Sequence, residues 1–143
     1  MKINAWMQQK AAAAYDGLKV WILPPENQRD RNKQQKYQLF EGTELIAINC
    51  GHNLTNGALL TCKKLSETSA EVTDDETGEV HILTIPQVCK HLRLRHAVTI
   101  AVIQGRTLQG RIKIWDSQSK YFTPATLYVA VSRATSGDLV EIA

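Results

Sequence analysis

The sequence is poor in the features that mark membrane and secreted proteins. No apolar run approaches the ~18 residues that a membrane-spanning helix needs, and the first residues lack the charged and then apolar pattern of a secretory signal. The three cysteines are an odd number without a CxxC spacing, which argues against a disulfide framework. These absences predict an intracellular protein with reduced thiols and no membrane partner.

Strong charge and metal-ligating patterns are also missing. The net charge is only +3, which permits a nucleic-acid partner without requiring one. Cys89, His91 and His96 lie close together in sequence, but their spacing is not that of a tetrahedral zinc site. We therefore expect a plain basic turn there and no metal site in this chain.

No phosphate-binding loop is present. The pattern GxxxxGK[ST], which cradles nucleotide phosphates, occurs nowhere in the chain. Asp74, Asp75 and Glu76 look like the acidic pair that holds magnesium in some nucleotide-binding proteins. However, they precede Gly78 in a predicted hairpin loop and do not end an apolar strand. A solvated turn is the simpler interpretation, and the chain by itself lacks a complete nucleotide site.

The chain does have enough apolar residues for a core of ordinary size, since 43% of its 143 residues are hydrophobic. A helix is predicted over 3–16, with Ile3, Met7 and Ala11 at helical spacing. A strand over 19–23 ends at a proline pair, and a wholly polar loop follows over 28–36. Short strands then predict a small antiparallel barrel. They cover residues 44–49, 58–63, 69–73 and 79–85.

Beyond Pro86 the pattern becomes that of an α/β protein. Thr123 as N-cap and Pro124 at the first helical position predict a helix over 123–134. The strands around it carry continuous apolar residues, which is typical of a parallel sheet covered on both faces. The other predicted elements are a helix over 88–92 and strands over 96–102, 111–115 and 139–142.

Two short motifs stand out near the C-terminus. The first, TIAVIQGRT, occupies residues 99–107, and the second, LYVAVSRAT, occupies residues 127–135 on the last predicted helix. Together they resemble motifs V and VI of superfamily 1 helicases, whose usual forms are TIxxxQGxT and YVAxSRA. Residues 42–57 look like the start of the barrel that interrupts the second RecA-like domain in the RecD-like, 5′-to-3′ branch. Ile3-Asn4 is similar to the tail of motif IV.

The resemblance implies an α/β fold. It would be a partial RecA-like parallel-sheet domain, the second domain of a P-loop NTPase helicase, with an inserted small antiparallel SH3-like β-barrel. Residues 1–36 would form the N-terminal helix, strand and polar linker, residues 37–85 the barrel, and residues 86–143 the segment with motifs V and VI. The chain would belong to an ATP-dependent DNA helicase. A missing N-terminal RecA-like domain would bind most of the ATP and Mg²⁺.

The resemblance also assigns roles to individual residues. Arg133 would be an arginine finger at the γ-phosphate, a role that suits a guanidinium because it stays charged and binds phosphate oxygens bidentately. Gln104 would relay the nucleotide state to the nucleic acid. Gly105 and Ser132 would complete the nucleotide-binding site. The expected contacts to single-stranded nucleic acid, DNA by preference, are Thr99, Arg106 and Thr107.

Simpler interpretations of the same residues remain open. Arg133 also suits a surface position at a helix C-terminus, where a positive charge meets the helix dipole. Gln104-Gly105 also makes a plain turn after a strand. Residues 101–103 are apolar where many relatives carry polar side chains, so contacts made by those side chains are missing here. The basic residues around the motifs suit either a phosphate-binding track or a solvated rim. They are Lys90, Arg93, Arg95, Arg106, Arg111 and Lys113.

Two rival functions fit the same sequence. One is a non-enzymatic nucleic-acid-binding module built on the barrel, with the C-terminal part as scaffold. The other is part of a viral RNA helicase of the same superfamily, because motifs V and VI do not separate DNA from RNA. The placement of Arg133 distinguishes a motor domain from the non-enzymatic module, since a motor needs this side chain accessible to a nucleotide.

The isolated chain is expected to hydrolyse no ATP, because it has no loop to hold the phosphates. A phosphate-release assay on the purified chain, with and without single-stranded DNA, checks this. ATP hydrolysis by the purified chain would contradict the assignment of the nucleotide site to another domain.

Overall fold

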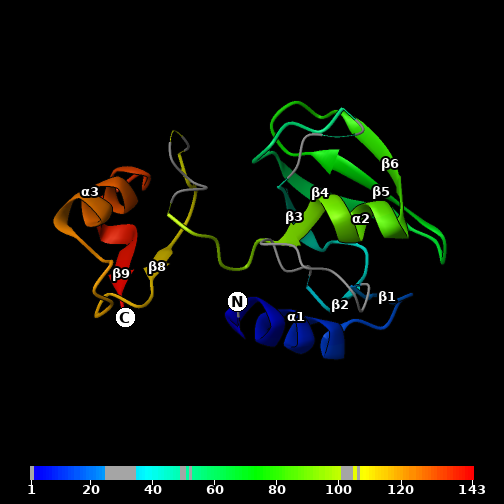
Figure 1. Cartoon of the computed structure of the whole chain (residues 1–143), viewed down its shortest axis with the longest axis horizontal. Coiled ribbons are helices and arrows are strands. Elements are labelled where there is room, and N and C mark those ends of the chain that lie inside the picture. The colour runs from blue at the N-terminus through cyan, green and yellow to red at the C-terminus, as the bar shows by residue number, and fades with distance from the viewer. Residues whose placement is uncertain (1, 25–34, 49–50, 52, 101–104, 106) are drawn as a thin grey trace. The chain divides into compact units, whose positions relative to one another are not determined.

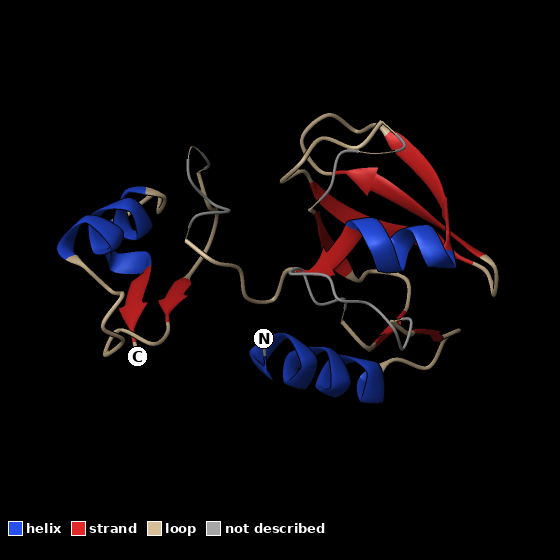
Figure 2. Cartoon of the chain, viewed as in Figure 1, coloured by secondary structure: helices blue, strands red, loops and turns tan. Residues whose placement is uncertain are grey.

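The computed structural model of the chain describes residues 2–24, 35–48, 51, 53–100, 105 and 107–143. The chain divides into two compact units, Met1–Ala97 and Val98–Ala143. Both units combine helices with strands, so the fold is mixed α/β as predicted (Figures 1 and 2).

The first unit is built on a five-stranded antiparallel sheet with the order β6-β5-β4-β3-β7. Its strands are β3 (Glu44–Ala47), β4 (Leu59–Leu65), β5 (Ser69–Asp74), β6 (Val80–Thr84) and β7 (Leu92–Leu94). Four of them match strands predicted from the sequence. The edge strands β6 and β7 do not pair with each other in the described residues, so hydrogen bonds do not close this sheet into a barrel.

Alternating side chains build the core of this unit. Leu60 and Cys62 in β4, and Ala70 and Val72 in β5, are buried on one face of the sheet, while their neighbours are more exposed. This period of two is what a half-buried strand requires. Burial raises the pKa of the Cys62 thiol to about 11, so it stays protonated at neutral pH.

Helix α2 (Ile85–His91) covers the buried face of the sheet (Figure 1). It begins three residues before the start predicted from the sequence. Thr84 accepts a hydrogen bond from the Gln87 backbone, and the Gln87 side chain accepts one from the Thr84 backbone. This capping box, with Pro86 in the first turn, sets the earlier start.

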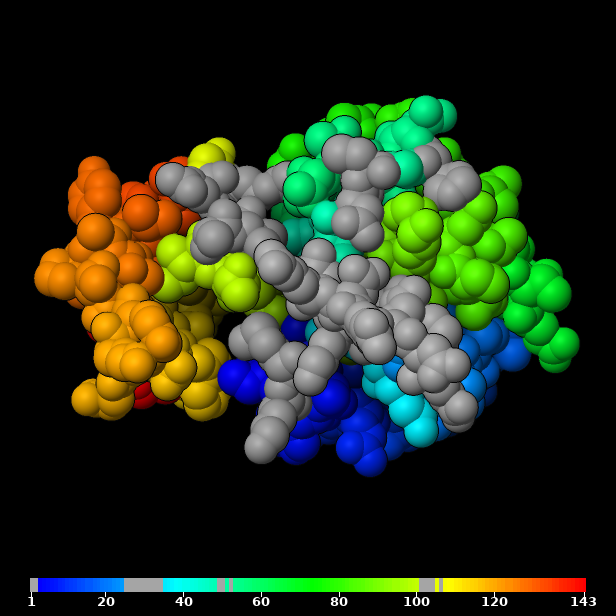
Figure 3. Space-filling view, in the orientation of Figure 1, coloured from blue at the N-terminus to red at the C-terminus, as the bar shows by residue number. Residues whose placement is uncertain are grey.

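Helix α1 (Lys2–Ala14) packs on β2 (Tyr37–Leu39), which pairs antiparallel with β1 (Val20–Ile22). The buried stripe of α1 is Asn4, Gln8 and Ala12, not the apolar stripe predicted from the sequence. Met7 from the predicted stripe is 38% exposed. One side of α1 lies open at the surface (Figure 3, blue).

The buried amides of α1 bind the last residues of this unit. Asn4 Nδ2 donates to the carbonyl oxygens of Leu94 and Ala97 at 3.2 and 2.8 Å, and Asn4 Oδ1 accepts from the Ala97 N–H at 2.6 Å. The strand predicted over 96–102 is therefore wrong over its described residues, 96–100, which form no strand. The backbone of Ala97 is satisfied by a side chain instead of a neighbouring strand.

Elements of the first unit also cross the expected domain boundaries. β1 and β2 pair across residue 36, where the sequence placed the start of the barrel. β7 adds to the sheet after residue 85, where the barrel was expected to end. The described sheet and hairpin therefore make one unit up to Ala97.

The second unit contains β8 (Ile112–Ile114), α3 (Pro124–Ser132), a 3₁₀ turn (Gly137–Leu139) and β9 (Val140–Ile142). β8 and β9 pair in parallel, as the sequence predicts (Figure 2). The Thr123 hydroxyl accepts a hydrogen bond from the Thr126 N–H at 3.2 Å, which confirms the predicted N-cap.

The parallel pair differs from the sheet covered on both faces that the sequence suggested. Ile114 is buried, but Lys113 beside it is exposed and forms an ion pair with Glu141. Apolar and polar residues therefore alternate in β8, and one face of the described pair is polar. In the described part of this unit, Ile114 and Ala130 are the only fully buried apolar residues.

Replacement of a core leucine is expected to destabilise the first unit strongly. Leu60 is 0% exposed, and Leu60→Ala should lower the free energy of unfolding by about 2–5 kcal/mol through lost contacts and a cavity. Leu23→Ala is the matched control, because Leu23 is 58% exposed and its loss should cost less than about 0.5 kcal/mol. Urea unfolding followed by circular dichroism measures both, and equal losses would contradict the assigned core.

His96 adds a pH dependence to the same region. Its Nε2 atom bonds Gln8 Oε1 at 2.8 Å, and burial lowers its pKa below 6.5, opposed by the negative charge of Glu44. Between the lowered pKa and 6.5 the unfolded chain binds more protons than the folded chain. The contribution of His96 to stability is therefore complete above pH 6.5 and falls as the pH drops through this window.

Titration of the His96 ring by NMR is expected to give a pKa below 6.5. Urea unfolding at pH 7.5 and 5.5 should show a smaller loss of stability at low pH in His96→Gln than in the wild type. A ring that titrates at or above 6.5 would show that burial does not control this histidine.

Candidate nucleotide and nucleic-acid site

The two C-terminal motifs meet through their backbones. The Leu108 N–H, next to the end of the first motif, donates to the Arg133 carbonyl oxygen at 2.7 Å. Leu108 and Ala134 also form an isolated parallel bridge. Leu108 comes before β8 in the chain, and Ala134 comes before β9. The residue that follows the first motif and the end of the second motif therefore lie side by side, ahead of the two strands.

Arg133 forms the C-cap of α3 in a right-handed helical conformation. Its side chain is half-buried, so it lies neither deep in the interior nor fully in water. The Nε atom is buried and has no hydrogen-bond partner among the described residues. Leaving a buried donor unpaired costs about 1–3 kcal/mol, which makes this position receptive to an acceptor, most strongly to an anionic oxygen.

The other described residues of the predicted site are accessible. Thr99 and Thr107 are exposed, and so is Ser132, whose hydroxyl donates to the Val129 carbonyl at 2.9 Å. Gly105 is exposed and has φ +82°, a left-handed conformation that favours glycine. Gln104 and Arg106 lie outside the described residues.

The basic residues around the motifs divide into different environments. Arg93 is buried, and its Nη1 donates to the carbonyl oxygens of Cys89 and Leu92 at 2.9 and 2.8 Å. Lys113 pairs with Glu141 at 3.0 Å and lies over the Trp115 ring. These contacts pair Arg93 and Lys113 with groups of the protein itself.

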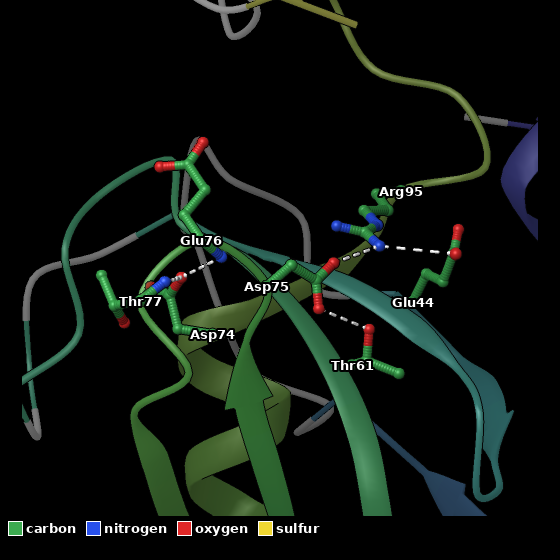
Figure 4. Close-up of polar contacts among 7 residues, drawn as sticks. All are labelled: Glu44, Thr61, Asp74, Asp75, Glu76, Thr77 and Arg95. Carbon is green, nitrogen blue, oxygen red and sulfur yellow. Dashed lines mark hydrogen bonds and ion pairs between the residues drawn. The ribbon is translucent and has the colours of Figure 1, made fainter. Parts of the chain in front are cut away.

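Arg95 makes the most specific of these contacts (Figure 4). Its Nη2 atom lies 2.7 Å from Asp75 Oδ2 and 3.4 Å from Glu44 Oε1, while its side chain is only 14% exposed. Thr61 donates from its hydroxyl to the other oxygen of Asp75 at 2.8 Å. Arg95 therefore joins the start of β3 to the hairpin loop between β5 and β6.

That hairpin loop is the solvated turn predicted from the sequence. Asp74 Oδ1 accepts hydrogen bonds from the backbone of Glu76 and Thr77 at 2.8 and 3.1 Å (Figure 4). Across the described residues, no three His, Cys, Asp or Glu side chains are grouped to hold a metal ion. Nor is any described helix both long and apolar enough to cross a membrane.

Sequence reasoning missed two buried polar residues, Asn4 and Gln8. They are 2% and 1% exposed, which is rare for amides unless every polar atom is bonded. Their spacing of four residues, which places them on one helix face, was the signal that could have revealed a buried polar stripe. The apolar residues at positions 3, 7 and 11 have the same spacing and predicted a different buried stripe. Asn4 itself was interpreted only through its similarity to the tail of motif IV.

Comparisons with known proteins give a likeness in fold. No protein-family model matches the chain, and no curated protein matches it. Three solved structures of Pif1 helicases resemble it. A Bacteroides Pif1 in complex with ADP-AlF3 and ssDNA matches 96% of the chain with a TM-score of 0.66 and 17% identity. A Bacteroides Pif1 bound to ssDNA matches 85% with a TM-score of 0.62 and 20% identity.

The third structure concerns DNA unwinding at forked dsDNA by two coordinating Pif1 helicases, and it matches 85% of the chain with a TM-score of 0.60 and 22% identity. The chain spans 37%, 33% and 31% of these three proteins, respectively. It therefore has the fold of about a third of a Pif1 helicase.

Proposed function

We propose that the chain is the second motor domain, with an inserted β module, of an ATP-dependent superfamily 1 helicase that acts on single-stranded DNA. The observation that carries the proposal is the bond from Leu108 to Arg133, together with the unpaired Nε of Arg133. This bond joins the residue that follows Thr107 to the backbone of Arg133, which supports assigning the two motifs to one site. The likeness to Pif1 structures supports the same assignment.

Arg133 acts in this proposal as the arginine finger. A nucleotide held mainly by another domain, with Mg²⁺, supplies the reacting phosphate. The guanidinium then provides a fixed positive charge and its unpaired donor where negative charge develops. Gly105 allows the backbone to approach this region closely, and Ser132 lies next to the finger. Gln104 is assigned the role of relaying the nucleotide state to the nucleic acid, because its position matches that residue of the motif.

The contacts to nucleic acid are assigned to residues of the first motif. Thr99 and Thr107 are exposed and offer hydroxyl groups and backbone N–H groups to phosphate oxygens, which position a strand without reading its sequence. Arg106 is assigned a charged contact to the nucleic acid because of its position in the first motif. DNA is preferred over RNA because two of the similar Pif1 structures hold ssDNA.

The second unit also supports a longer protein. Tyr128 and Val131 on α3 are 75% and 38% exposed, and the described part of this unit has a small core. Units with a small core are marginally stable unless another surface covers their exposed apolar residues. We assign the covering surface to further domains of the helicase, among them an N-terminal RecA-like domain.

The strand order of the first unit concerns the inserted β module of the proposal. A meander of four strands, β3 to β6, is followed by a helix and by β7, which returns to pair with β3. We assign this module to the SH3-like insertion of a helicase of the RecD-like, 5′-to-3′ branch.

Replacement of Arg133 tests the function. In the full-length enzyme, Arg133→Ala should lower kcat for ATP about 10³–10⁵-fold, because charge stabilisation in the transition state is lost. The affinity for a fluorescent ATP analogue should change less than about threefold, since ground-state contacts lie mainly elsewhere. Steady-state hydrolysis at saturating single-stranded DNA and a binding titration provide the two measurements.

Lys120→Ala is the control, because Lys120 is an exposed cation in the same unit and lies outside both motifs. It should hydrolyse ATP at the wild-type rate. An Arg133→Ala enzyme that retains hydrolysis, or that loses binding and hydrolysis equally, would reject the finger.

A further inference from the structure

The two edges of the five-stranded sheet differ in how they are covered. At one edge, all three residues of β7 are buried, and the Leu94 N–H donates to Gln35 Oε1 at 3.0 Å. At the other edge, β6 has no strand beyond it among the described residues (Figure 1). An edge strand whose hydrogen-bonding groups stay free can pair with a strand of another chain.

Hydrogen bonds at the two ends of the β5-β6 pair fix which backbone groups of β6 point outward. The Asp74 N–H donates to the Glu79 carbonyl at 2.8 Å, and the Ile85 N–H donates to the Thr68 carbonyl at 3.1 Å. Bonded pairs alternate along an antiparallel ladder. Every second residue of β6 between these two ends therefore turns its N–H and C=O away from β5.

The outward-facing residues are Val80, Ile82 and Thr84. The Thr84 N–H is already used, because it donates to Gln87 Oε1 at 2.9 Å in the capping box of α2. Within the described part of the chain, no hydrogen bond reaches the outward backbone groups of Val80 and Ile82. We call residues 80–82 the free edge of β6, because their outward N–H and C=O groups are available for pairing.

The side chains of the free edge are apolar and open. Val80 and Ile82 are 53% and 74% exposed, while His81 between them is buried. Natural edge strands usually carry a lysine, a proline or a bulge that hinders pairing with another chain. β6 has neither lysine nor proline, and its register with β5 runs without a bulge. The free edge therefore has the features of a strand that accepts an extended peptide.

The charges around the free edge are negative. Glu71 in β5 lies directly opposite Ile82, so its carboxylate is on the same exposed face of the sheet. Glu79 comes directly before Val80 and is exposed. β5 and β6 contain no lysine or arginine, and the lysines of the sheet lie on β4, two strands from the edge. A basic peptide is therefore the one whose charge complements this edge.

We propose that the free edge of β6 binds an extended basic peptide segment of a partner protein, which adds to the sheet as a further strand. The backbone groups of Val80 and Ile82 pair with the peptide, and their side chains contact its alternate apolar residues. Glu71 and Glu79 attract its lysine or arginine residues. This surface belongs to the first unit alone, so the proposal does not depend on the motor function.

Peptide binding to the 143-residue chain tests the partner. The probe is a fluorescein-labelled peptide of about six alternating valine and lysine residues, a typical strand length, and its fluorescence anisotropy measures binding. Ile82→Lys should weaken binding at least about tenfold, because it removes the apolar contact and repels the peptide. Gln9→Lys is the matched control, since Gln9 is exposed on α1 and gains the same charge. Its affinity should stay within about twofold of wild type.

A second peptide, with glutamate in place of each lysine, tests the charge of the partner. Its strand pattern is the same, but the carboxylates around the free edge repel it. It should bind at least about tenfold more weakly than the basic peptide. Equal affinities would reject a basic partner.

Hydrogen exchange of single amides, followed by NMR on the wild-type chain, tests the mode of binding. Without peptide, the amides of Val80 and Ile82 should exchange fast and those of His81 and Leu83 slowly. Saturating basic peptide should slow exchange at Val80 and Ile82 about tenfold and leave His81 and Leu83 unchanged. Uniform slowing along β6, or none, rejects strand addition. Because this measurement needs no variant, it decides the question even if Ile82→Lys fails to fold.

Sedimentation equilibrium tests whether a second copy of the chain occupies the edge instead. The chain without peptide should be monomeric at the concentrations used for binding. A dimer in which the Val80 and Ile82 amides are already protected would reject the peptide partner. These experiments use neither nucleotide nor DNA, so their outcome is separate from that of Arg133→Ala.

Discussion

The pairing of the Asn4 amide with the backbone of Ala97 is the interaction on which the arrangement of the first unit depends. A buried N–H or C=O must be paired, and at Ala97 no strand of the described sheet is adjacent to do so. A helix side chain from the opposite end of the unit supplies both bonds. In consequence α1 turns a polar stripe inward, Gln8 follows Asn4 into the interior, and the first and last segments of the unit are held together.

The same requirement organises the second unit on a smaller scale. The Leu108 N–H finds its acceptor in the Arg133 carbonyl, and this one bond joins two residues that are 25 positions apart in the chain. The Arg133 side chain, by contrast, retains a buried donor that no described residue satisfies. The backbone carbonyl of Arg133 is therefore paired within the chain, whereas its charged side chain is paired incompletely by the described residues.

The cations near the motifs show how a charge pattern in sequence separates in space. Arg93 and Arg95 lie in one short strand region, yet the first bonds backbone carbonyls in the interior and the second bridges two carboxylates. Their charges stabilise the first unit. Among the described residues predicted for the site, Thr99, Gly105, Thr107 and Ser132 are exposed, and Arg133 is half-buried.

Local patterns determined much of the fold from the sequence alone. Thr123 and Pro124 determine where α3 begins, and alternating apolar residues determine β4 and β5, because capping and strand pleat act over a few residues. The motifs also made Arg133 the candidate for a charged role, which stays a prediction. Tertiary structure alone decided which stripe of α1 is buried, that residues 96–100 form no strand, and that Leu108 meets Arg133. These outcomes depend on which distant backbone groups need a partner, and adjacent residues carry no information about that need.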